Sequence, residues 1–356
     1  MAAVSVITPA WNAAAWLSET IASVRAQTHA DWEWLIVDDG STDDTGAIVG
    51  RASRADTRIR LLRQPNAGPS AARNRAMREA RGDYFALLDS DDVWLPCYLA
   101  DQLAILAAHP EIAVLSANAI NFGGVFDGTP LLATWPRRIR HVSLLELVAV
   151  EDSLCILSIF RREVSDAIGG FDATLRRSED YDLWLRAAAA GYRIAVNPQP
   201  LGLYRRRPDS VSADEVLMLE AMKAPLLKIR RLCPDRPDVV LEVDRQLARV
   251  ARRSLRAAAR SALIDGDMAE LRRHLAALAT ATGAVRYRLA GWLAGTAPSV
   301  IAGAYACKQK WLLRRRPARG YWSMFAPRVA HSRSSDQGIE RALRALRRVR
   351  LERDAP

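Results

Sequence analysis

The chain has 356 residues, half of them hydrophobic, which is enough for two folded domains and excludes wholesale disorder. Its formal charge of +11 is unevenly distributed, because residues 1–213 carry 22 Lys/Arg against 26 Asp/Glu, whereas residues 214–356 carry 29 against 14. We therefore expect the two parts of the chain to meet different partners.

Strands and helices are predicted to alternate in the first part of the chain. Short apolar runs have the length and content of buried strands at Val4–Thr8, Trp32–Val37, Arg58–Leu62 and Tyr84–Leu88. Helical patterns separate these runs at Trp16–Gln27, at a helix with Asp43 and Asp44 in its first turn, and at Ala71–Ala80. This alternation predicts βαβ units, and hence an α/β fold with a mostly parallel sheet flanked by helices.

Polar residues follow three of these predicted strands, at Trp11–Asn12, Asp38–Asp39 and Asp89–Asp92. Ligands bind at the carboxyl ends of the strands in sheets of this kind, so we expect these residues to gather at one edge. The sequence contains neither a GxGxxG fingerprint nor a P-loop, so neither of those phosphate-binding motifs accounts for the edge.

Three carboxylates end the fourth predicted strand: Asp89, Asp91 and Asp92. Crowded carboxylates repel one another unless a positive charge lies among them, and a hard cation such as Mg²⁺ or Mn²⁺ takes oxygen ligands and can also hold phosphates. The alternative is an acidic turn that caps a helix starting near Pro96.

The next part of the chain continues the mixed pattern. Strands are predicted at Ala113–Ile120, Ser153–Phe160, Tyr192–Val196 and Gly202–Arg205, and a short helix at Arg161–Ile168. A tight turn follows at Gly169–Asp172. Glu179 and Asp180 open a helix over Tyr181–Ala190, which Gly191 ends.

Six blocks in this order resemble family 2 glycosyltransferases, and together they cover roughly residues 1–212. The blocks are Val4–Asn12, Val37–Asp43, Asn66–Asn74, Leu88–Asp92, Gly169–Asp172 and Glu179–Arg186. Any one block is weak evidence for the family, but six blocks in the same order are specific to it. The resemblance implies the GT-A fold and transfer of a sugar from a nucleotide diphosphate-sugar with inversion at the anomeric carbon.

The resemblance also implies roles in donor binding. Pro9 and Trp11 would line the base pocket, with Trp11 offering a stacking face. Asp39 would accept a hydrogen bond from a uracil-type base. Arg73 would approach the base or the diphosphate, and Asp89 would lie near the ribose. The alternatives are that Trp11 is ordinary core, as we expect Trp184 to be, and that Arg73 and Arg75 form an exposed helix face.

The remaining implied roles concern the metal and the chemistry. Asp91 and Asp92 would hold the metal on the diphosphate, and Asp180 would be the catalytic base, with Glu179 beside it as the second choice. A carboxylate base that takes the acceptor proton typically contributes about 10²–10⁴-fold, and a cation neutralises the departing diphosphate. The alternative for Asp180 is a helix cap.

One departure from the family pattern concerns the metal. Many relatives carry Tyr-Arg-x-His after the last strand, whereas this chain has Tyr204-Arg-Arg-Arg207. A guanidinium cannot ligate a cation, so Arg207 could replace that histidine only as a phosphate contact.

The basic part of the chain is Ala-, Leu- and Arg-rich and predicted to be helical, with breaks near Cys233–Pro237, Asp265–Gly266 and Gly283. Leu289–Cys307 has no charge and is followed by Lys308–Arg316, a pairing that suits an anionic bilayer surface. The alternatives are a soluble helical subdomain and a transmembrane insertion. We expect domains at 1–212 (catalytic), 213–330 (basic and helical) and 331–356 (a basic tail, mobile or helical only on contact).

The cysteines and the N-terminus indicate the compartment. The cysteines at 97, 155, 233 and 307 form no CxxC pair, and no signal peptide follows Met1, so we expect a cytoplasmic protein, peripheral on the inner face of the cytoplasmic membrane.

We expect a metal-dependent, inverting bacterial glycosyltransferase that uses a UDP-type donor and a saccharide or lipid-linked saccharide acceptor in polysaccharide or glycoconjugate biosynthesis. The alternatives are a nucleotidyltransferase and a nucleic-acid-binding protein. No nucleic-acid partner is expected, because the basic part has no recognised module for it.

Overall fold

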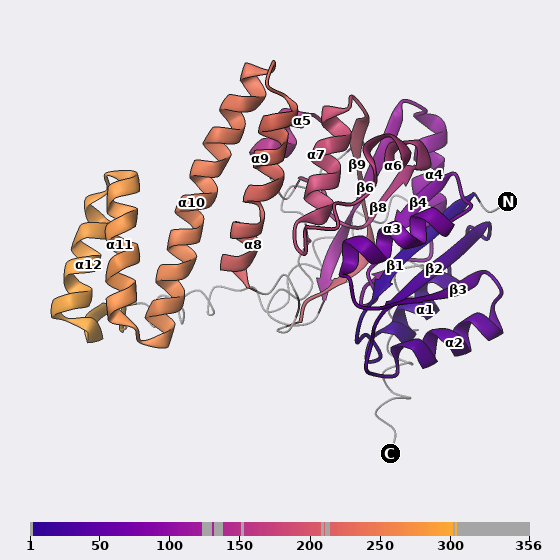
Figure 1. Ribbon diagram of the computed structural model, residues 1–356, viewed down its shortest axis with the longest axis horizontal. Coiled ribbons are helices and arrows are strands. Elements are labelled where there is room, and N and C mark those ends of the chain that lie inside the picture. The colour runs from indigo at the N-terminus through magenta and orange to yellow at the C-terminus, as the bar shows by residue number, and fades with distance from the viewer. Residues whose placement is uncertain are drawn as a thin grey trace. The chain divides into compact units, whose positions relative to one another are not determined.

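The computed structural model describes residues 3–122, 130–131, 138–150, 153–207, 210, 214–301 and 303–304. The chain divides into two compact units between Ser210 and Val211. We call them the N-terminal unit and the C-terminal unit and describe each by itself (Figure 1).

The strands described in the N-terminal unit form one sheet in the order β3-β2-β1-β4-β8-β6-β9-β5, with β7 paired to β9. Pairing is parallel from β3 to β4 and between β6 and β9, and antiparallel where β5, β7 and β8 join. The predicted α/β fold with a mostly parallel sheet is therefore confirmed. The strands are β1 Val4–Ala10, β2 Trp32–Asp39, β3 Ile59–Gln64, β4 Tyr84–Leu87, β5 Val93–Trp94, β6 Ile112–Phe122, β7 Arg140–Val142, β8 Ser158–Arg161 and β9 Arg193–Arg205.

Helices pack around this sheet (Figure 1). The central strands are buried almost throughout, which is why β1 and β2 have continuous rather than alternating apolar sequences. The helices are α1 Leu17–Arg25, α2 Thr45–Ala55, α3 Pro69–Glu79, α4 Tyr98–Ala108, α5 Leu144–Ala149, α6 Arg162–Ile168 and α7 Glu179–Ala189.

The structure corrects the sequence prediction mainly in the later strands. The two strands predicted at 192–196 and 202–205 are one strand, β9, whose pairing with β6 shifts register near Ser116 and Asn118. The prolines at 198 and 200 lack N–H donors, so the sequence indicated a break where the strand continues through an irregularity. The strand predicted at 153–160 begins only at Ser158. The very short β5 and β7 were not predicted, because two or three residues carry no periodicity.

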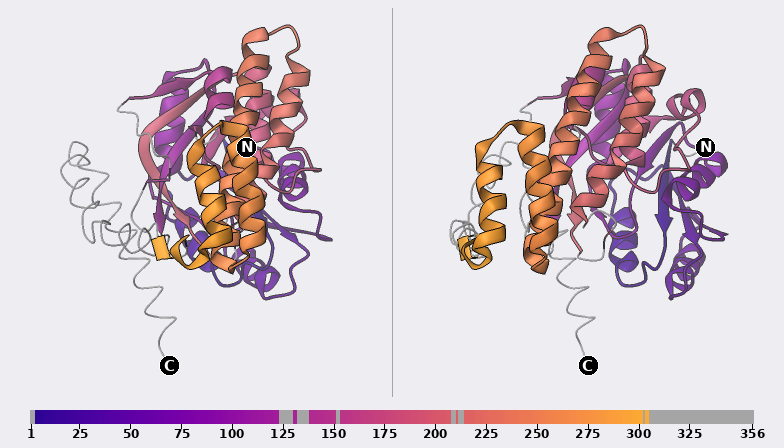
Figure 2. Two further views of the ribbon diagram at one scale, coloured as in Figure 1. Left: turned by 90° about the vertical axis from the view of Figure 1, so that its left-hand side faces the viewer. Right: turned by 60° about the vertical axis from the view of Figure 1, so that its left-hand side comes forward.

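The C-terminal unit is helical as predicted, with α8 Glu215–Ala221, α9 Lys223–Leu232, α10 Pro237–Asp265, α11 Met268–Thr282 and α12 Val285–Thr296. Gly266 and Gly283 end α10 and α11 in the left-handed conformation, at φ 76° and 67°. Helices α10, α11 and α12 lie side by side (Figure 2) and share a small core of Ala and Leu side chains.

The uncharged stretch predicted at 289–307 is only partly described, and within it α12 ends at Thr296. Among the described residues, no helix combines the length and the apolar character that crossing a membrane requires. The basic stretch 308–316 and the tail 331–356 lie outside the described residues.

Candidate active site

The acidic turn, Asp89–Asp92, connects β4 to β5. The Asp92 N–H donates to the Asp89 carbonyl oxygen at 3.2 Å, and the Thr8 hydroxyl of β1 donates to the Leu88 carbonyl oxygen at 2.7 Å. Asp92 is 1% exposed. The turn does not cap the following helix, because the N-cap of α4 is Cys97 and makes no side-chain cap bond. The helix-cap alternative for this turn is therefore wrong.

The end of β9 holds this turn in place. The Arg205 N–H donates to Asp92 Oδ1 and its Nε donates to the Asp91 carbonyl oxygen, both at 2.8 Å. The Arg207 Nε lies 3.1 Å from Asp91 Oδ2. The sequence analysis missed Arg205, because nothing in the local pattern shows that β9 pairs with β5 and ends beside the acidic turn.

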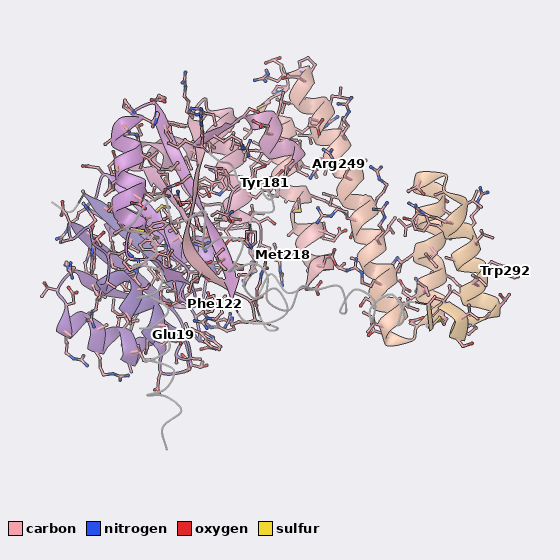
Figure 3. All side chains as sticks on the ribbon, turned by 180° about the vertical axis from the view of Figure 1, so that it is seen from behind. Glu19, Phe122, Tyr181, Met218, Arg249 and Trp292 are labelled. Atoms are coloured by element: carbon pink, nitrogen blue, oxygen red, sulfur yellow. The ribbon has the colours of Figure 1, made fainter. Side chains whose placement is uncertain are left out.

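Arg205 is itself fixed from two sides. Its guanidinium pairs with Glu19 of α1 and lies 4.5 Å from the ring centroid of Trp16 and 4.2 Å from that of Phe122. Figure 3 labels Glu19 and Phe122 in the N-terminal unit. A guanidinium held by a carboxylate and two aromatic faces has little freedom, so we interpret Arg205 as a rigid support of the acidic turn.

The acidic turn retains excess negative charge in spite of these arginines. Burial, and then the charge of Asp89, raise the pKa of Asp91 to about 6. Burial, and then Asp91 and Asp89, raise the pKa of Asp92 well above its usual value. Among the described residues, no group donates a hydrogen bond to the buried Asp92 Oδ2. Such a cluster is stabilised by an added cation.

The donor set fits a hard divalent cation in part. Carboxylate oxygens are the ligands that Mg²⁺ and Mn²⁺ prefer, and Asp91 and Asp92 supply them. Within the described part of the chain, no three side chains of the ligating types are arranged to hold a metal. Diphosphate oxygens and water would therefore complete the shell, as is usual for Mg²⁺ sites on nucleotides.

Arg73 of α3 connects the acidic turn to α7. It is 3% exposed, and its two terminal nitrogens donate to Asp89 Oδ1 at 2.6 Å and to Glu179 Oε1 at 2.7 Å. Burial opposes its charge, but the two carboxylates outweigh burial and raise the pKa of Arg73. The alternative of an exposed helix face is wrong for Arg73, whereas the half-buried Arg75 pairs with Glu79 across a 3.6 Å gap.

Glu179 and Asp180 open α7 as predicted, but they differ in environment. Glu179 is tied to Arg73, whereas Asp180 accepts a hydrogen bond from the Tyr181 N–H at 2.8 Å. Burial, and then the charge of Glu179, raise the pKa of Asp180 to about 6. The N-cap of α7 is Ser178 rather than Asp180. Asp180 is thus the carboxylate of this pair that is better suited to exchange a proton near neutral pH.

One packing feature fixes α7 against the strands, and another fixes the turn before α7 against α3. Phe85 of β4, Phe160 of β8 and Trp184 of α7 form an edge-to-face row with centroids 5.6 and 5.7 Å apart. The Asn74 side chain of α3 bonds both the N–H and the carbonyl oxygen of Phe171. Gly170 is required there, because its φ is 72° and a Cβ would lie 2.6 Å from Asn74 Oδ1. Trp184 is core, as expected.

The residues predicted to bind the base lie at the ends of β1 and β2, which run parallel with Ala10 opposite Asp38. Pro9 is within β1, and Trp11 just beyond it is 58% exposed, so the alternative that it is core is wrong. Asp39 accepts hydrogen bonds from Gln64 Nε2, the Ala67 N–H and the Gly68 N–H at 2.7–2.9 Å. Asp39 therefore orders the turn before α3. Of these three hydrogen bonds, the Gly68 bond goes to Oδ2 and the other two go to Oδ1.

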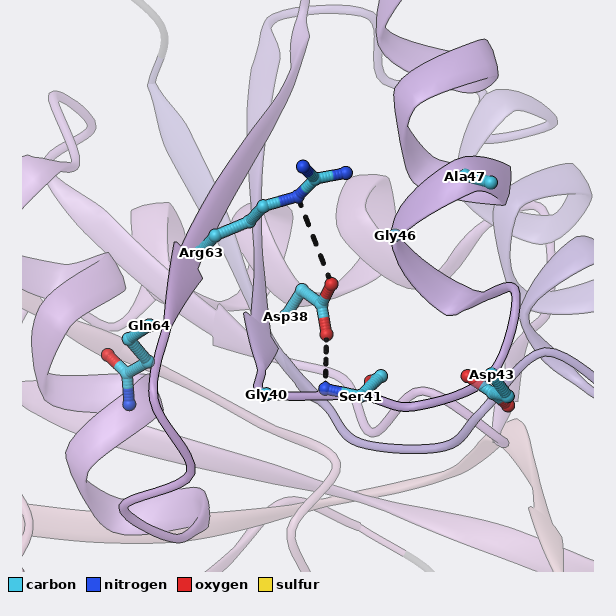
Figure 4. A pocket seen from close by; sticks show the side chains of 8 residues that line it. All are labelled: Asp38, Gly40, Ser41, Asp43, Gly46, Ala47, Arg63 and Gln64. Atoms are coloured by element: carbon cyan, nitrogen blue, oxygen red, sulfur yellow. Dashed lines mark hydrogen bonds and ion pairs between the residues drawn. The ribbon is translucent and has the colours of Figure 1, made fainter.

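A separate open pocket of about 320 Å³ lies between the end of β2, the start of α2 and β3 (Figure 4). Asp38 accepts from the Ser41 N–H at 3.0 Å and lies 4.0 Å from Arg63 across this pocket. Asp38, which was expected at the ligand-binding edge, lines this pocket, but none of the residues given a role in binding the donor or the metal does, so we assign the pocket no part in the chemistry. Its lining is Asp38, Gly40, Ser41, Asp43, Gly46, Ala47, Arg63 and Gln64.

Known structures show the class of fold to which this arrangement belongs. S. aureus TarS, residues 1–349 in complex with UDP-GlcNAc, matches with a TM-score of 0.59 at 20% identity, covering 89% of this chain and 93% of that chain. The mannosyltransferase PcManGT from Pyrobaculum calidifontis, in complex with GDP-Man and Mn²⁺, matches with a TM-score of 0.53 at 20% identity, covering 84% and 86%. The N-terminal unit therefore has the GT-A fold that the sequence blocks implied.

Sequence relatives establish the family. The family described as glycosyl transferase family 2 matches residues 5–169. TuaG of Bacillus subtilis, named as a teichuronic acid biosynthesis glycosyltransferase, is 32% identical over 223 residues, covering 60% of this chain and 82% of that protein. WfgD of Escherichia coli, named as a UDP-Glc:alpha-D-GlcNAc-diphosphoundecaprenol beta-1,3-glucosyltransferase, is 31% identical over 216 residues, covering 60% and 80%. The chain belongs to glycosyltransferase family 2 and is a glycosyltransferase.

Proposed function

We propose that the enzyme transfers a sugar from a nucleoside diphosphate-sugar of the UDP type to a hydroxyl acceptor in polysaccharide or glycoconjugate biosynthesis, with inversion. The observation that carries this proposal is that two acidic segments distant in sequence are joined by Arg73, which donates to Asp89 of the acidic turn and to Glu179, the neighbour of Asp180. Asp180 is a carboxylate of raised pKa. The names of TuaG and WfgD place those relatives in biosynthesis of this kind, and TarS binds UDP-GlcNAc.

The proposed reaction is a single displacement. The acceptor oxygen attacks the anomeric carbon, the bond from that carbon to the diphosphate breaks, and the nucleoside diphosphate leaves with the electron pair. Asp180 takes the acceptor proton, and a pKa of about 6 leaves most of its carboxylates ionised at pH 7. Arg73 keeps Glu179 occupied, so one carboxylate of the pair is available as the base.

The donor would bind along the edge of the sheet. Trp11 is exposed and offers a face on which a base can stack. Pro9 would line the same pocket, and Asp39 would accept a hydrogen bond from the base. Asp89 would lie near the ribose, and its contact with Arg73 would orient it.

The enzyme is proposed to use Mn²⁺ or Mg²⁺ held by Asp91 and Asp92. The support is the raised pKa values of the partly buried Asp91 and the buried Asp92, together with the Mn²⁺ in the structure of PcManGT. When bound, the cation would neutralise the charge that develops on the departing diphosphate.

A panel of nucleotide-sugars incubated with the enzyme and Mn²⁺ tests this proposal. We expect release of a nucleoside diphosphate with at least one UDP-sugar, because the carboxylate base and the acidic turn suit no other bond cleavage as well. Exchange of pyrophosphate into the donor would instead indicate a nucleotidyltransferase. No turnover of any donor, with acceptors extracted from polysaccharide-producing cells present, would contradict the proposal.

We also propose that the C-terminal unit binds the anionic inner face of the cytoplasmic membrane, where a lipid-linked acceptor would be located. Helix α12 presents Val285, Leu289 and Trp292, which are 57%, 58% and 63% exposed, at positions i, i+4 and i+7 of one face. The exposed Arg288 lies on the same face, four residues before Trp292, which Figure 3 shows projecting from the helix. An apolar stripe with arginine and tryptophan suits an anionic bilayer surface, and WfgD is named for a diphosphoundecaprenol-linked acceptor.

Flotation with liposomes tests this membrane proposal. We expect recovery with anionic vesicles at low salt and loss at high salt, since each basic residue near an anionic surface contributes about 1 kcal/mol and salt screens it. The double variant Leu289→Ser/Trp292→Ser should float less, whereas Leu241→Ser, at an exposed position of α10, should float like the wild type. Equal recovery with neutral vesicles would contradict the electrostatic version. No recovery with either would leave a helical subdomain without a membrane role.

A further inference from the structure

The two arginines at the end of β9 that contact the acidic turn do so in different ways. The backbone N–H of Arg205 donates to Asp92, and its guanidinium contacts Glu19 and two aromatic rings. The Arg205 side chain is 10% exposed. Arg207 follows the end of β9, its side chain is 24% exposed, and its guanidinium pairs with the Asp91 carboxylate. Arg207 lies beyond the end of the strand, and its guanidinium carbon is 6.0 Å from the ring centroid of Trp16, farther than that of Arg205.

Arg206, between them, has its guanidinium directed elsewhere. Its Nε donates to Asn121 Oδ1 on β6 at 2.8 Å. Side chains alternate between the two faces of an extended segment, so Arg205 and Arg207 share the side of the acidic turn and Arg206 does not. Arg206 therefore has the same charge as Arg207 at almost the same place in the chain, without the contact to Asp91.

The Arg207 guanidinium lies where a cation on Asp91 would need space. Its Nε is 3.1 Å from Asp91 Oδ2. A cation bound to the same oxygen would bring a second positive charge close to the guanidinium, and the two charges would repel each other. A guanidinium cannot become a metal ligand, so Arg207 competes with a cation for this oxygen instead of joining its coordination shell. A diphosphate beside the cation offers the displaced guanidinium a new partner, because arginine pairs well with phosphate oxygens.

Building on the proposed function, we propose that Arg207 is a positioning residue that occupies Asp91 in the free enzyme and transfers to the donor diphosphate when the cation binds. The cation and the nucleotide then bind with positive coupling, since each helps to move the same guanidinium. Free cation binds weakly, and the site assembles when the donor arrives. By linkage, UDP strengthens Mn²⁺ binding by the same factor by which Mn²⁺ strengthens UDP binding.

The test measures Mn²⁺ binding to the full chain by electron paramagnetic resonance of free Mn²⁺, with and without UDP. In the wild type we expect UDP to tighten Mn²⁺ binding by a factor within the usual range for coupled sites, about 5–150-fold. In Arg207→Gln, Mn²⁺ alone should bind about five- to tenfold more tightly than in the wild type, and the effect of UDP should shrink, because no guanidinium has to be displaced. Arg207→Lys keeps the charge and should bind Mn²⁺ alone as weakly as the wild type.

Arg206→Gln is the matched control. It removes the same charge and should leave both Mn²⁺ affinities as in the wild type, which separates the local contact with Asp91 from a general loss of positive charge. Circular dichroism verifies that each variant is folded. If Arg207→Gln binds Mn²⁺ alone no more tightly than Arg206→Gln, while the wild type binds Mn²⁺ with UDP, the inference about Arg207 is wrong and the proposed function stands. If the folded wild type binds neither Mn²⁺ nor UDP, both are wrong.

Discussion

The variant Asp180→Asn is expected to lower the turnover number by about 10²–10⁴-fold, which is the usual contribution of a general base. Asparagine has the same shape, and its amide oxygen can still accept the hydrogen bond that the Tyr181 N–H donates, so the start of α7 should be preserved. Donor affinity should therefore change little. Steady-state kinetics with the donor identified by the panel, together with calorimetric titration of that donor, measure the two effects separately.

The control for this prediction is Asp166→Asn, at an exposed position of α6. It removes one carboxylate of the same unit and should leave both turnover and donor affinity unchanged. Glu179→Gln is not a neutral control, because it removes one of the two partners of the buried Arg73. A turnover number for Asp180→Asn within a few-fold of the wild type would contradict the role of Asp180.

The pH profile should identify the same group. Burial and Glu179 raise the pKa of Asp180 to about 6, and a base acts only when ionised, so kcat/KM should fall as the pH falls through that value. At saturating Mn²⁺, where a bound cation keeps Asp91 ionised, Asp180→Asn should lose this acidic limb and retain only a low, flat rate. An unchanged limb in this variant would assign the titration to another group.

The second large effect is expected for Asp91→Asn and Asp92→Asn. Each removes a proposed ligand of the cation and should reduce the rate of transfer by about 10²–10³-fold. Removing one group that stabilises charge developing in a transition state typically costs that much. Donor binding in the presence of Mn²⁺ should weaken as well. Full activity of either variant in EDTA would show that the metal assignment is wrong.

The stability of these two variants should change in the opposite direction from their activity. Burial and like charges raise the pKa values of Asp91 and Asp92, so their ionised forms destabilise the folded state at neutral pH. A neutral amide removes that cost, and without metal the melting temperature of each variant should equal or exceed that of the wild type. This result would distinguish a functional loss from a folding defect.

The elements of the site were largely predictable from the sequence, but their contacts were not. The alternation of short apolar runs and helices indicated a parallel sheet, and the acidic residues after β4 and at the start of α7 are local signals. The link between them is not local, because Arg73 and Glu179 lie 106 residues apart in the sequence. The alternative that Arg73 lies on an exposed helix face was also wrong. It arose because an arginine on a helix usually faces solvent.

The contacts that the end of β9 makes with the acidic turn were the main omission, although a strand at Gly202–Arg205 was predicted. The sequence analysis considered Arg207 only for the histidine it replaces, and did not consider Arg205. Both contacts to the acidic turn depend on β9 running as one strand through its prolines beside β6 and β5, which no periodicity indicates. The breaks between the C-terminal helices, in contrast, were predicted, because glycine after a helical run is a strong local signal.

The central claim is that the sugar is transferred in a single displacement, for which Asp180 serves as the base. The anomeric configuration of the product first formed tests the single displacement most directly. Proton NMR follows the conversion of an α-linked UDP-sugar, with its natural acceptor or with water, in real time. The proposed mechanism predicts that the β-anomer forms first, because the acceptor attacks opposite the departing diphosphate. Formation of the α-anomer would require a different mechanism and would contradict the role proposed for Asp180.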